Sequence, residues 1–414
     1  IQALVKLHPS LRLAFDFSDG QWKQRFTPFE SRTYLWRTES LTESEFSAFA
    51  QEIHQSMDIR SGRLIQAGYA QMASGNSRLM ITIHHLAVDG VSWRILLDDL
   101  WKAYQQVASG QSINLMPISA SLDEAVNAIE KWCEGPDGKL MQDTWHESSV
   151  SNQKIEPARY RDKQTFESEL SNQQTQQLLR DATVNLGVDT QTILISALVS
   201  ALGSADEKNV PVYLEGHGRE PSVFADVDLS RMVGWTTSLY PMIGHYQADE
   251  LAVLSSTAQY LGQVKRDGGI GYGSRYLDDG VIEECQAQAT FNYLGQYSSN
   301  SFAHWCAPIE NGGLPQSGLN KMLTPLVINA QIVSGRLTIA WEYATTHYSA
   351  NSIQNLAEKY TASLIQLINA TPQPKAIVAD AQLVEKLNDT PNERQPVFCI
   401  HPVTGRVTGY QKLA

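Results

Sequence analysis

The sequence lacks the features that membrane and nucleic-acid partners require. Its 414 residues contain no run of about 18 apolar residues, the length that a membrane-spanning helix needs. Lysine and arginine number 32 against 44 aspartates and glutamates, so the net charge is −12. Because a phosphate backbone binds to basic surfaces, we expect neither nucleic acid nor a membrane among the partners.

Cysteine is also scarce. The four cysteines stand far apart, with none of the C-x-x-C spacing of zinc and redox sites (Cys133, Cys285, Cys306 and Cys399). This pattern predicts reduced thiols in a cytoplasmic protein, and no secretory leader is expected. The helical pattern already includes Ile1, and the pattern of residues 397–414 stops midway, so we expect the chain to be part of a longer protein.

Apolar periodicity predicts two α/β lobes followed by a tail. The first lobe, 1–150, has an expected strand over Leu79–Leu86 and then a helix with Ser92 as its N-cap. A polar stretch over 146–163 predicts the connection to the second lobe, 151–380. We expect a linker over 381–395 after that lobe.

The second lobe has the clearest local signals. Helical spacing of Leu178, Leu179 and Ala182 predicts one helix, and Asp189-Thr190 caps the next. A strand is expected over Val210–Leu214. Ser334-Gly335 separates two strand-like runs and predicts a hairpin. A helix follows with one apolar face, ahead of two prolines that end the pattern (Ile353, Leu356, Ala357, Tyr360, Leu364, Leu367 and Ile368, then Pro372 and Pro374).

The sharpest motif is His84-His85-Leu86-Ala87-Val88-Asp89-Gly90, between a predicted strand and a predicted helix. Neighbouring side chains in a strand face opposite ways, so the two imidazoles do not suit one metal ion. A core histidine and a turn histidine are alternatives. We favour acid/base use of one imidazole, which titrates near neutral pH. Asp89 before Gly90 is more typical of a turn held by an ion pair or backbone hydrogen bonds.

Two further segments carry candidate residues. Glu215 lies in Glu215-Gly216-His217-Gly218-Arg219-Glu220 after a predicted strand, where a surface carboxylate is the alternative. Asn292 and Tyr293 stand side by side in Phe291–Gln296, where an aromatic core strand is the alternative.

Together, these segments resemble the epimerization domains of nonribosomal peptide synthetases, within the condensation-domain superfamily. The resemblance covers about residues 1–380. It begins with an early helix at Leu4–Phe15 and continues with five motifs that stand in the same order as in the family. These motifs are HHLAVDGVSWRIL at 84–96, EGHGRE at 215–220, DLSRMVGWTTSLYP at 228–241, GIGYGSRYL at 269–277 and FNYLGQ at 291–296. The histidine motif marks the superfamily, whereas EGHGRE with DLSR-x-VGW marks epimerization domains. Thr236 stands where an aromatic residue is expected.

The resemblance implies an α/β (α+β) fold of two chloramphenicol-acetyltransferase-like lobes in a V, with the site in a tunnel between them. It implies inversion of the α-carbon of an aminoacyl or peptidyl residue held as a phosphopantetheine thioester. His85 and Glu215 would act as the opposed acid and base. Asn292 and Tyr293 would polarise the carbonyl or donate to the enolate, and His84, Asp89 and Gly90 would support the loop.

The resemblance also implies partners. No metal or directly bound cofactor is needed, because the phosphopantetheine belongs to a carrier domain. That carrier and an adenylation domain would lie upstream in the same chain. Residues 396–414 (PVFCIHPVTGRVTGYQKLA from Pro396) resemble the start of a type I thioesterase domain, whose catalytic residues would lie further on.

Three alternatives remain. A condensation domain, which forms peptide bonds, shares the histidine motif, and Glu215 in its EGHGRE setting separates the two. A catalytically inactive domain that recruits a tailoring enzyme would not need His85 and Glu215, so the presence of both residues argues against this alternative. A stand-alone acyltransferase is disfavoured by the thioesterase-like tail.

Overall fold

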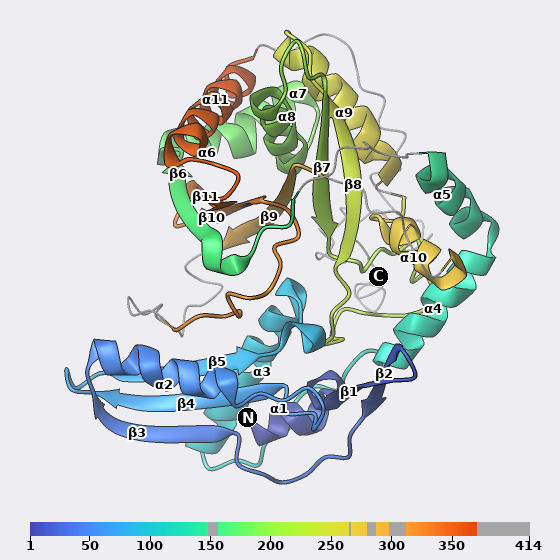
Figure 1. Ribbon diagram of the computed structural model, residues 1–414. Coiled ribbons are helices and arrows are strands. Elements are labelled where there is room, and N and C mark those ends of the chain that lie inside the picture. The colour runs from blue at the N-terminus through green and yellow to red at the C-terminus, as the bar shows by residue number, and fades with distance from the viewer. Residues whose placement is uncertain (148–155, 265, 280–286, 298–311, 371–414) are drawn as a thin grey trace, which may run out of the picture.

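The computed structural model describes residues 1–147, 156–264, 266–279, 287–297 and 312–370. Predictions made for 381–395 and 396–414, and for residues 148–155 of the connection at 146–163, lie outside these ranges. Two bodies stacked one above the other make up the molecule (Figure 1). The lower body is built from the first 108 residues, and the upper body surrounds a six-stranded sheet. The fold is a mixed α/β arrangement of two lobes, as predicted.

The first lobe packs two small sheets around its core. A two-stranded sheet pairs β1 with β2, and a three-stranded sheet has the order β3-β4-β5. Its elements are α1 (Gln2–Leu7), η1 (Pro9–Arg12), β1 (Leu13–Ser18), β2 (Gln21–Phe26), β3 (Leu35–Leu41), α2 (Glu43–Gln55), β4 (Ile65–Met72), β5 (Ser77–Ile83), η2 (His85–Ala87) and α3 (Gly90–Ala108). The early helix is shorter than the expected Leu4–Phe15: it stops at Leu7, just before Pro9, whose ring disfavours a helical His8.

Two predicted boundaries in this lobe are wrong. The strand expected to run to Leu86 ends at Ile83, because the chain turns into η2 there. The N-cap of α3 is Asp89, not Ser92: the Asp89 carboxylate accepts the backbone N–H of Ser92, which lies in the first turn of the helix. Aspartate and serine both cap helices well, so the spacing of apolar residues alone could not decide which of Asp89 and Ser92 is the N-cap.

The second lobe is a six-stranded sheet of order β6-β11-β10-β9-β7-β8 with helices α8, α9 and α11 on one face (Figure 1). Its elements are η3 (Tyr160–Asp162), β6 (Lys163–Glu169), α6 (Asn172–Gln176), a π-helical turn (Gln177–Ala182), α7 (Thr183–Leu186), α8 (Thr190–Leu202), β7 (Asn209–Gly216), β8 (Ser238–His245), α9 (Glu250–Val264), α10 (Ile270–Asp279), β9 (Ala289–Tyr297), β10 (Leu326–Val333), β11 (Arg336–Ala344) and α11 (Ala350–Ile368).

Local sequence signals in this lobe are confirmed. Asp189 caps α8 by accepting the N–H of Thr192, and β7 contains the expected strand. The hairpin turn has positive φ at both Ser334 (50°) and Gly335 (78°), as a type I′ turn requires. The final helix, α11, carries the predicted apolar face into the core.

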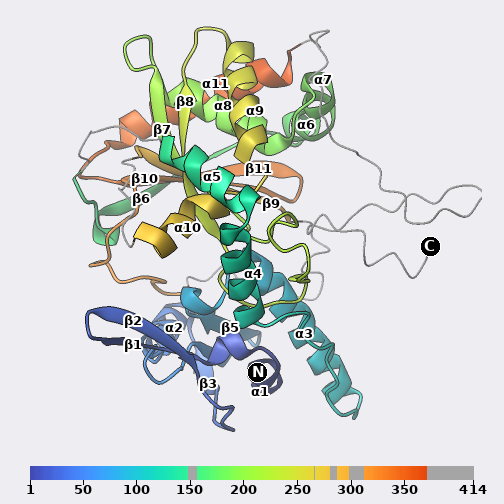
Figure 2. The same cartoon turned by 90° about the vertical axis from the view of Figure 1, so that its right-hand side faces the viewer.

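Two helices join the lobes. α4 (Leu122–Glu134) and α5 (Pro136–Glu147) run along the side of the molecule (Figure 2). Both precede residue 150, where the lobe boundary is expected, yet Trp145 of α5 packs in the core of the second lobe. In the part of the chain that the structure describes, no single helix is long and apolar enough to cross a membrane; Asn172–Leu186 and Thr190–Leu202 pass that test only together, bent by 92°.

Candidate active site

His84 and His85 sit at the turn that leaves β5, so strand alternation does not govern both of them. His84 caps η2, its Nδ1 accepting the backbone N–H of Leu86 at 3.2 Å. Burial and the neighbouring His85 lower the pKa of His84, which favours the neutral ring that this hydrogen bond needs. His85 begins η2 and its side chain is exposed. The turn therefore holds His84 and presents His85.

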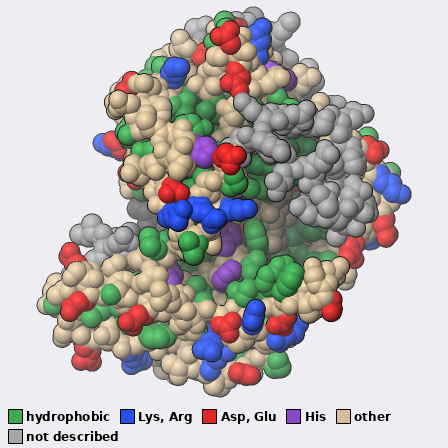
Figure 3. Space-filling view, viewed as in Figure 1, with side chains coloured by type: hydrophobic (Ala, Val, Ile, Leu, Met, Phe, Trp, Pro, Cys, Tyr) green, Lys and Arg blue, Asp and Glu red, His purple; other side chains and the backbone are tan. Residues whose placement is uncertain are grey.

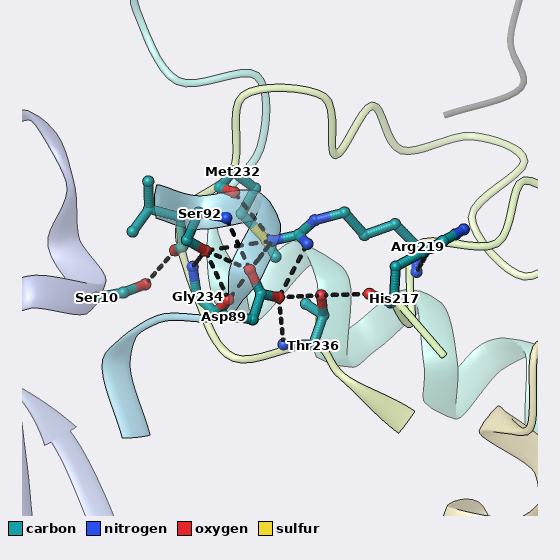
Figure 4. A network of polar contacts seen from close by, with 9 residues as sticks. Ser10, Asp89, Ser92, His217, Arg219, Met232, Gly234 and Thr236 are labelled. Carbon is teal, nitrogen blue, oxygen red and sulfur yellow. Dashed lines mark hydrogen bonds and ion pairs between the residues drawn. The ribbon is translucent and has the colours of Figure 1, made fainter. Parts of the chain in front are cut away.

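Asp89 anchors the start of α3 in a buried network (Figure 4). Its carboxylate forms a bidentate ion pair with Arg219, with Oδ2–Nη1 at 2.9 Å and Oδ1–Nη2 at 3.2 Å. It also accepts hydrogen bonds from Ser92 and from the backbone and hydroxyl of Thr236. Burial opposes ionisation, but Arg219 and these hydrogen bonds outweigh it and lower the pKa of Asp89. Asp89 thus holds loops together and does not face the cleft.

Gly90, which the resemblance expects to support the loop, lies at the start of α3. It is the first, exposed residue of α3, and a Cβ there would meet no atom within 4 Å. The space around position 90 would therefore accommodate a side chain.

The loop between β7 and β8, residues 217–237, carries Arg219 and reaches down to the first lobe (Figure 1). Val233 of this loop packs in the first lobe's core, and its carbonyl accepts the Ser10 hydroxyl at 2.6 Å. A second, partly buried ion pair joins Arg231 to Asp99 of α3 at 2.8 Å. The loop is therefore fixed to α3 at two separate points.

The loop brings Trp235 to His85. Their rings are in a T-shaped arrangement with centroids 5.3 Å apart, although Trp235 is 49% exposed. Thr236, at the position where an aromatic residue was expected, lies with its hydroxyl 2.9 Å from Asp89 Oδ2 and 3.0 Å from the carbonyl of His217. A polar side chain at 236 is thus accommodated by the network, not by aromatic packing.

Glu215 lies near the end of β7, on the sheet face opposite the helices, because its neighbour Leu214 is fully buried in the helix-covered core. Glu215 is an exposed residue, although neighbouring protein partly desolvates its carboxylate. This partial burial raises the pKa of Glu215, while the nearby His85 lowers it. Glu215 and His85, from separate lobes, are thus near enough to interact electrostatically.

The space between the lobes is a hollow lined by histidine and apolar side chains (Figure 3). His85 and Glu215 are both exposed residues on elements that border it, η2 and β7. In the described ranges, no group of three or more histidine, cysteine or acidic side chains could hold a metal ion. An imidazole and a carboxyl group, the side chains of His85 and Glu215, are of the types that can transfer protons.

The structure separates Asn292 from Tyr293. Strand pairing sets Leu214 beside Phe291, so Asn292 lies beside Glu215 on the cleft face. Tyr293 faces the other way and packs against the helix-covered core. Burial, followed by Asp189, raises the pKa of Tyr293. Of this candidate pair, only Asn292 accompanies Glu215.

A second group of titratable side chains follows Glu215 in the chain. His217 Nε2 lies 3.4 Å from Glu220 Oε1, and the His217 Nδ1 accepts the backbone N–H of Arg219. Burial and the nearby Asp267 raise the pKa of Glu220 to about 7. Burial also raises the pKa of Asp267, whose carboxylate accepts the N–H groups of Gly269 and Gly271.

Sequence reasoning did not single out Arg219, Trp235 or Asn329 as site residues. Arg219 and Trp235 stand inside motifs that were recognised, so their charge and aromatic ring were available signals. Asn329 Oδ1 lies 3.0 Å from the Asn292 Nδ2. Only the pairing of β9 with β10 brings these two residues together.

The fold and site define a two-lobed protein with an imidazole and a carboxylate facing one cleft. The chain belongs to the condensation-domain family, which it matches over residues 1–387. It is 32% identical over 400 residues to a component protein of the linear gramicidin synthase of Brevibacillus parabrevis, covering 90% of this chain and 8% of that protein. It is 30% identical over 414 residues to bacitracin synthase 3 of Bacillus licheniformis, covering 94% and 6%. The chain thus spans less than a tenth of these relatives.

Solved structures agree on the fold. The epimerization domain from the third module of tyrocidine synthetase B superposes with a TM-score of 0.80 at 26% identity, covering 89% of this chain and 86% of that one. The first condensation domain of the CDA synthetase gives 0.64 at 14% identity, covering 90% and 87%, a likeness of fold alone.

Proposed function

We propose that this domain epimerises the α-carbon of an aminoacyl or peptidyl residue held as a phosphopantetheine thioester on a carrier domain of a nonribosomal peptide synthetase. The observation that carries the proposal is the approach of His85 and Glu215 across the cleft, one from each lobe. The likeness to an epimerization domain supports it. The cytoplasmic location, the upstream carrier and adenylation domains and the downstream thioesterase belong to the same proposal.

Inversion needs two proton-transfer groups on opposite sides of one carbon. The α-hydrogen is acidic because the thioester delocalises the resulting carbanion into an enolate. One of the two groups, His85 or Glu215, takes the α-proton, the C–H electron pair moves into the enolate, and the other group returns a proton to the opposite face. The raised pKa of Glu215 suits it to carry a proton for part of this cycle.

The surroundings of the pair have supporting tasks. Asn292 lies beside Glu215 and can donate an amide hydrogen bond to it or to the enolate oxygen. Asp89 and Arg219 hold the loop that carries Trp235, and Trp235 contacts His85. Tyr293, on the core face, takes no part in this scheme.

Replacing Glu215 by glutamine tests the proposal. The amide keeps the shape of the side chain but transfers no proton, so we expect exchange of the α-hydrogen into heavy water to fall by at least about 10²-fold. The assay uses the domain with an aminoacyl-loaded carrier, with circular dichroism as the check on folding. Glu167→Gln, on the edge strand β6 of the same sheet, is the control.

Condensation is the second candidate, because His85 belongs to a motif that the two activities share. Chirality of the product and dipeptide formation are measured on the same loaded carriers. Full exchange in Glu215→Gln, or a dipeptide in place of an inverted residue, would overturn the epimerase proposal.

A further inference from the structure

A segment of the second lobe, residues 312–322, crosses to the first lobe beside α2, and we call it the strap (Figure 1). One end of the strap is tied to the second lobe by main-chain hydrogen bonds with residues 158–161. The other end, residues 312–314, contacts α2. The strap therefore bridges the lobes at a place separate from the loop 217–237, which contacts α3.

Two side chains of α2 hold the strap. Gln51 Oε1 accepts the N–H of Leu314 at 3.0 Å. One turn later, the His54 Nε2 lies 3.0 Å from the carbonyl oxygen of Gly312. Gly313, between these two contacts, has a φ of +83°, and a Cβ there would lie 3.2 Å from Gln51 Oε1. The strap is thus hydrogen-bonded to the end of α2 and packs closely against it.

His54 also contacts the strand that leads to His85. Its Nδ1 lies 3.0 Å from the hydroxyl oxygen of Thr82, a residue of β5 that is only 6% exposed. Because a carbonyl only accepts, the neutral ring carries its proton on Nε2, and Nδ1 accepts the Thr82 O–H. β5 pairs with β4 alone among the described strands, and it ends at Ile83, two residues before His85. One imidazole therefore connects the strap to the end of β5.

His85 consequently lies between two connections to the second lobe. Before it in the chain, His54 links β5 to the strap; after it, the ion pair of Asp89 with Arg219 links the start of α3 to the loop after β7. We propose that His54 is a positioning residue, which sets the approach of His85 to Glu215 by joining the strap to β5. The inference rests on the proposed function for its use in catalysis, which needs both groups at one α-carbon.

The two connections act together. Two lobes that meet at one place can rotate about it, and such motion is expected where the shared interface is small. A second connection at a distance from the first removes this rotation. Because the loop contacts α3 and the strap contacts α2, the turn that carries His85 is held on both sides. Loss of the strap contact should let the separation of His85 and Glu215 vary.

The electrostatic coupling of His85 to Glu215 measures that separation without substrate. The domain is labelled with ¹³C at glutamate side-chain carboxyls, and the Glu215 signal is assigned by its loss in Glu215→Gln. His85 lowers the pKa of Glu215, so His85→Gln should raise the Glu215 titration midpoint. The size of this rise is the coupling, which weakens when the two charges move apart or water enters between them.

His54→Leu removes both hydrogen bonds of the ring. We expect the coupling to shrink to about half, because distance and intervening water weaken it. Gln51→Leu removes the neighbouring strap contact and should act in the same direction. His54→Gln places an amide donor near the position of Nε2, within reach of the Gly312 carbonyl, and should recover part of the loss.

A matched control is the exposed His245 at the far end of β8, whose Nδ1 lies 3.0 Å from Asn209 Oδ1. His245→Leu also removes a hydrogen-bonded histidine, but it should leave the coupling in place. Circular dichroism checks that each variant is folded. An unchanged coupling in His54→Leu would overturn the inference, and so would equal losses in His54→Leu and His54→Gln or in His54→Leu and His245→Leu.

The outcome can be told apart from that of the proposed function. If Glu215→Gln kept full α-hydrogen exchange, the epimerase proposal would fail, while the response of the coupling to His54→Leu could still be measured. If both hold, His54→Leu should slow exchange about 10-fold through kcat, with KM for the loaded carrier unchanged. A smaller coupling with an unchanged exchange rate would overturn the positioning role.

Discussion

Asp89 and Arg219, 130 residues apart in the chain, form a bidentate ion pair in which both side chains are only 2% exposed. The pair joins the start of α3 in the first lobe to the loop that follows β7 in the second. Since His85 lies just before α3 and Glu215 just before that loop, the pair also fixes the two elements that present the proposed acid and base.

Asp89→Asn should therefore destabilise the protein strongly. The variant leaves the Arg219 guanidinium buried without its counter-charge, at a cost of about 3–5 kcal/mol in the free energy of unfolding. Urea unfolding followed by circular dichroism measures this. Asp226→Asn is the control, because its ion pair with Lys131 is exposed at 3.7 Å and exposed pairs contribute about 0–1 kcal/mol. Similar small losses in both variants would contradict the anchoring role.

The features that could be predicted from the sequence are those whose interacting residues lie close together along the chain. The turn at Ser334-Gly335 and the cap at Asp189 were predictable because their partners lie within a few residues. The end of β5 was missed because a strand and a short 3₁₀ turn leave the same apolar spacing at His84 and His85.

The site depended on contacts that no local pattern contains. Alternation along β9 already implied that Asn292 and Tyr293 face opposite ways, but which one meets the cleft depends on the helices that cover the sheet. Glu215 and Asn292 become neighbours because β7 pairs with β9. Arg219 reaches Asp89 because the loop after β7, which is distant in the sequence, folds against the start of α3.

Glu220 should make stability depend on pH. Its pKa is raised from 4.5 to about 7. Between these two pH values the folded state therefore keeps a proton that the unfolded state has released. This stabilisation is complete below pH 4.5 and is lost as the pH rises through about 7, by an amount on the order of 3 kcal/mol. The glutamine of Glu220→Gln stays neutral at every pH, so this variant should not lose the part of the unfolding free energy that Glu220 contributes between pH 4.5 and about 7.

The comparison is between variants at each pH. Asp267, with its own raised pKa, and His217, with a lowered pKa, are present in both proteins, so the difference between wild type and Glu220→Gln reports the titration of Glu220 together with its coupling to these two neighbours. Denaturant unfolding at pH 5, 6, 7 and 8 gives that difference. The exposed Glu130→Gln is the control. Parallel stability curves for wild type and Glu220→Gln would show that Glu220 does not hold the proton.

Gly218 should not tolerate a side chain. Its φ is +63°, and an added Cβ would lie 1.5 Å from the Thr236 carbonyl oxygen. Gly218→Ala should lower the free energy of unfolding by about 3 kcal/mol or more, because backbone strain and the clash act together. Gly273→Ala in α10 has open space around the added methyl and should stabilise slightly, by up to about 1 kcal/mol. Equal unfolding free energies for the two variants would rule out the clash.

Trp235 should support the reaction through the ring of His85. Trp235→Leu removes the T-shaped contact at 5.3 Å, and because Trp235 is 49% exposed the fold should survive. An aromatic pair contributes about 0.5–1.5 kcal/mol, so we expect α-hydrogen exchange to slow about 2–10-fold. Trp235→Phe keeps an aromatic face and should restore most of the rate. Exchange rates are measured with the same loaded carrier for all three proteins, alongside their unfolding free energies. If Leu and Phe slowed exchange equally, loss of indole volume and not loss of the ring contact would be the cause, and Trp235 would have no positioning role toward His85.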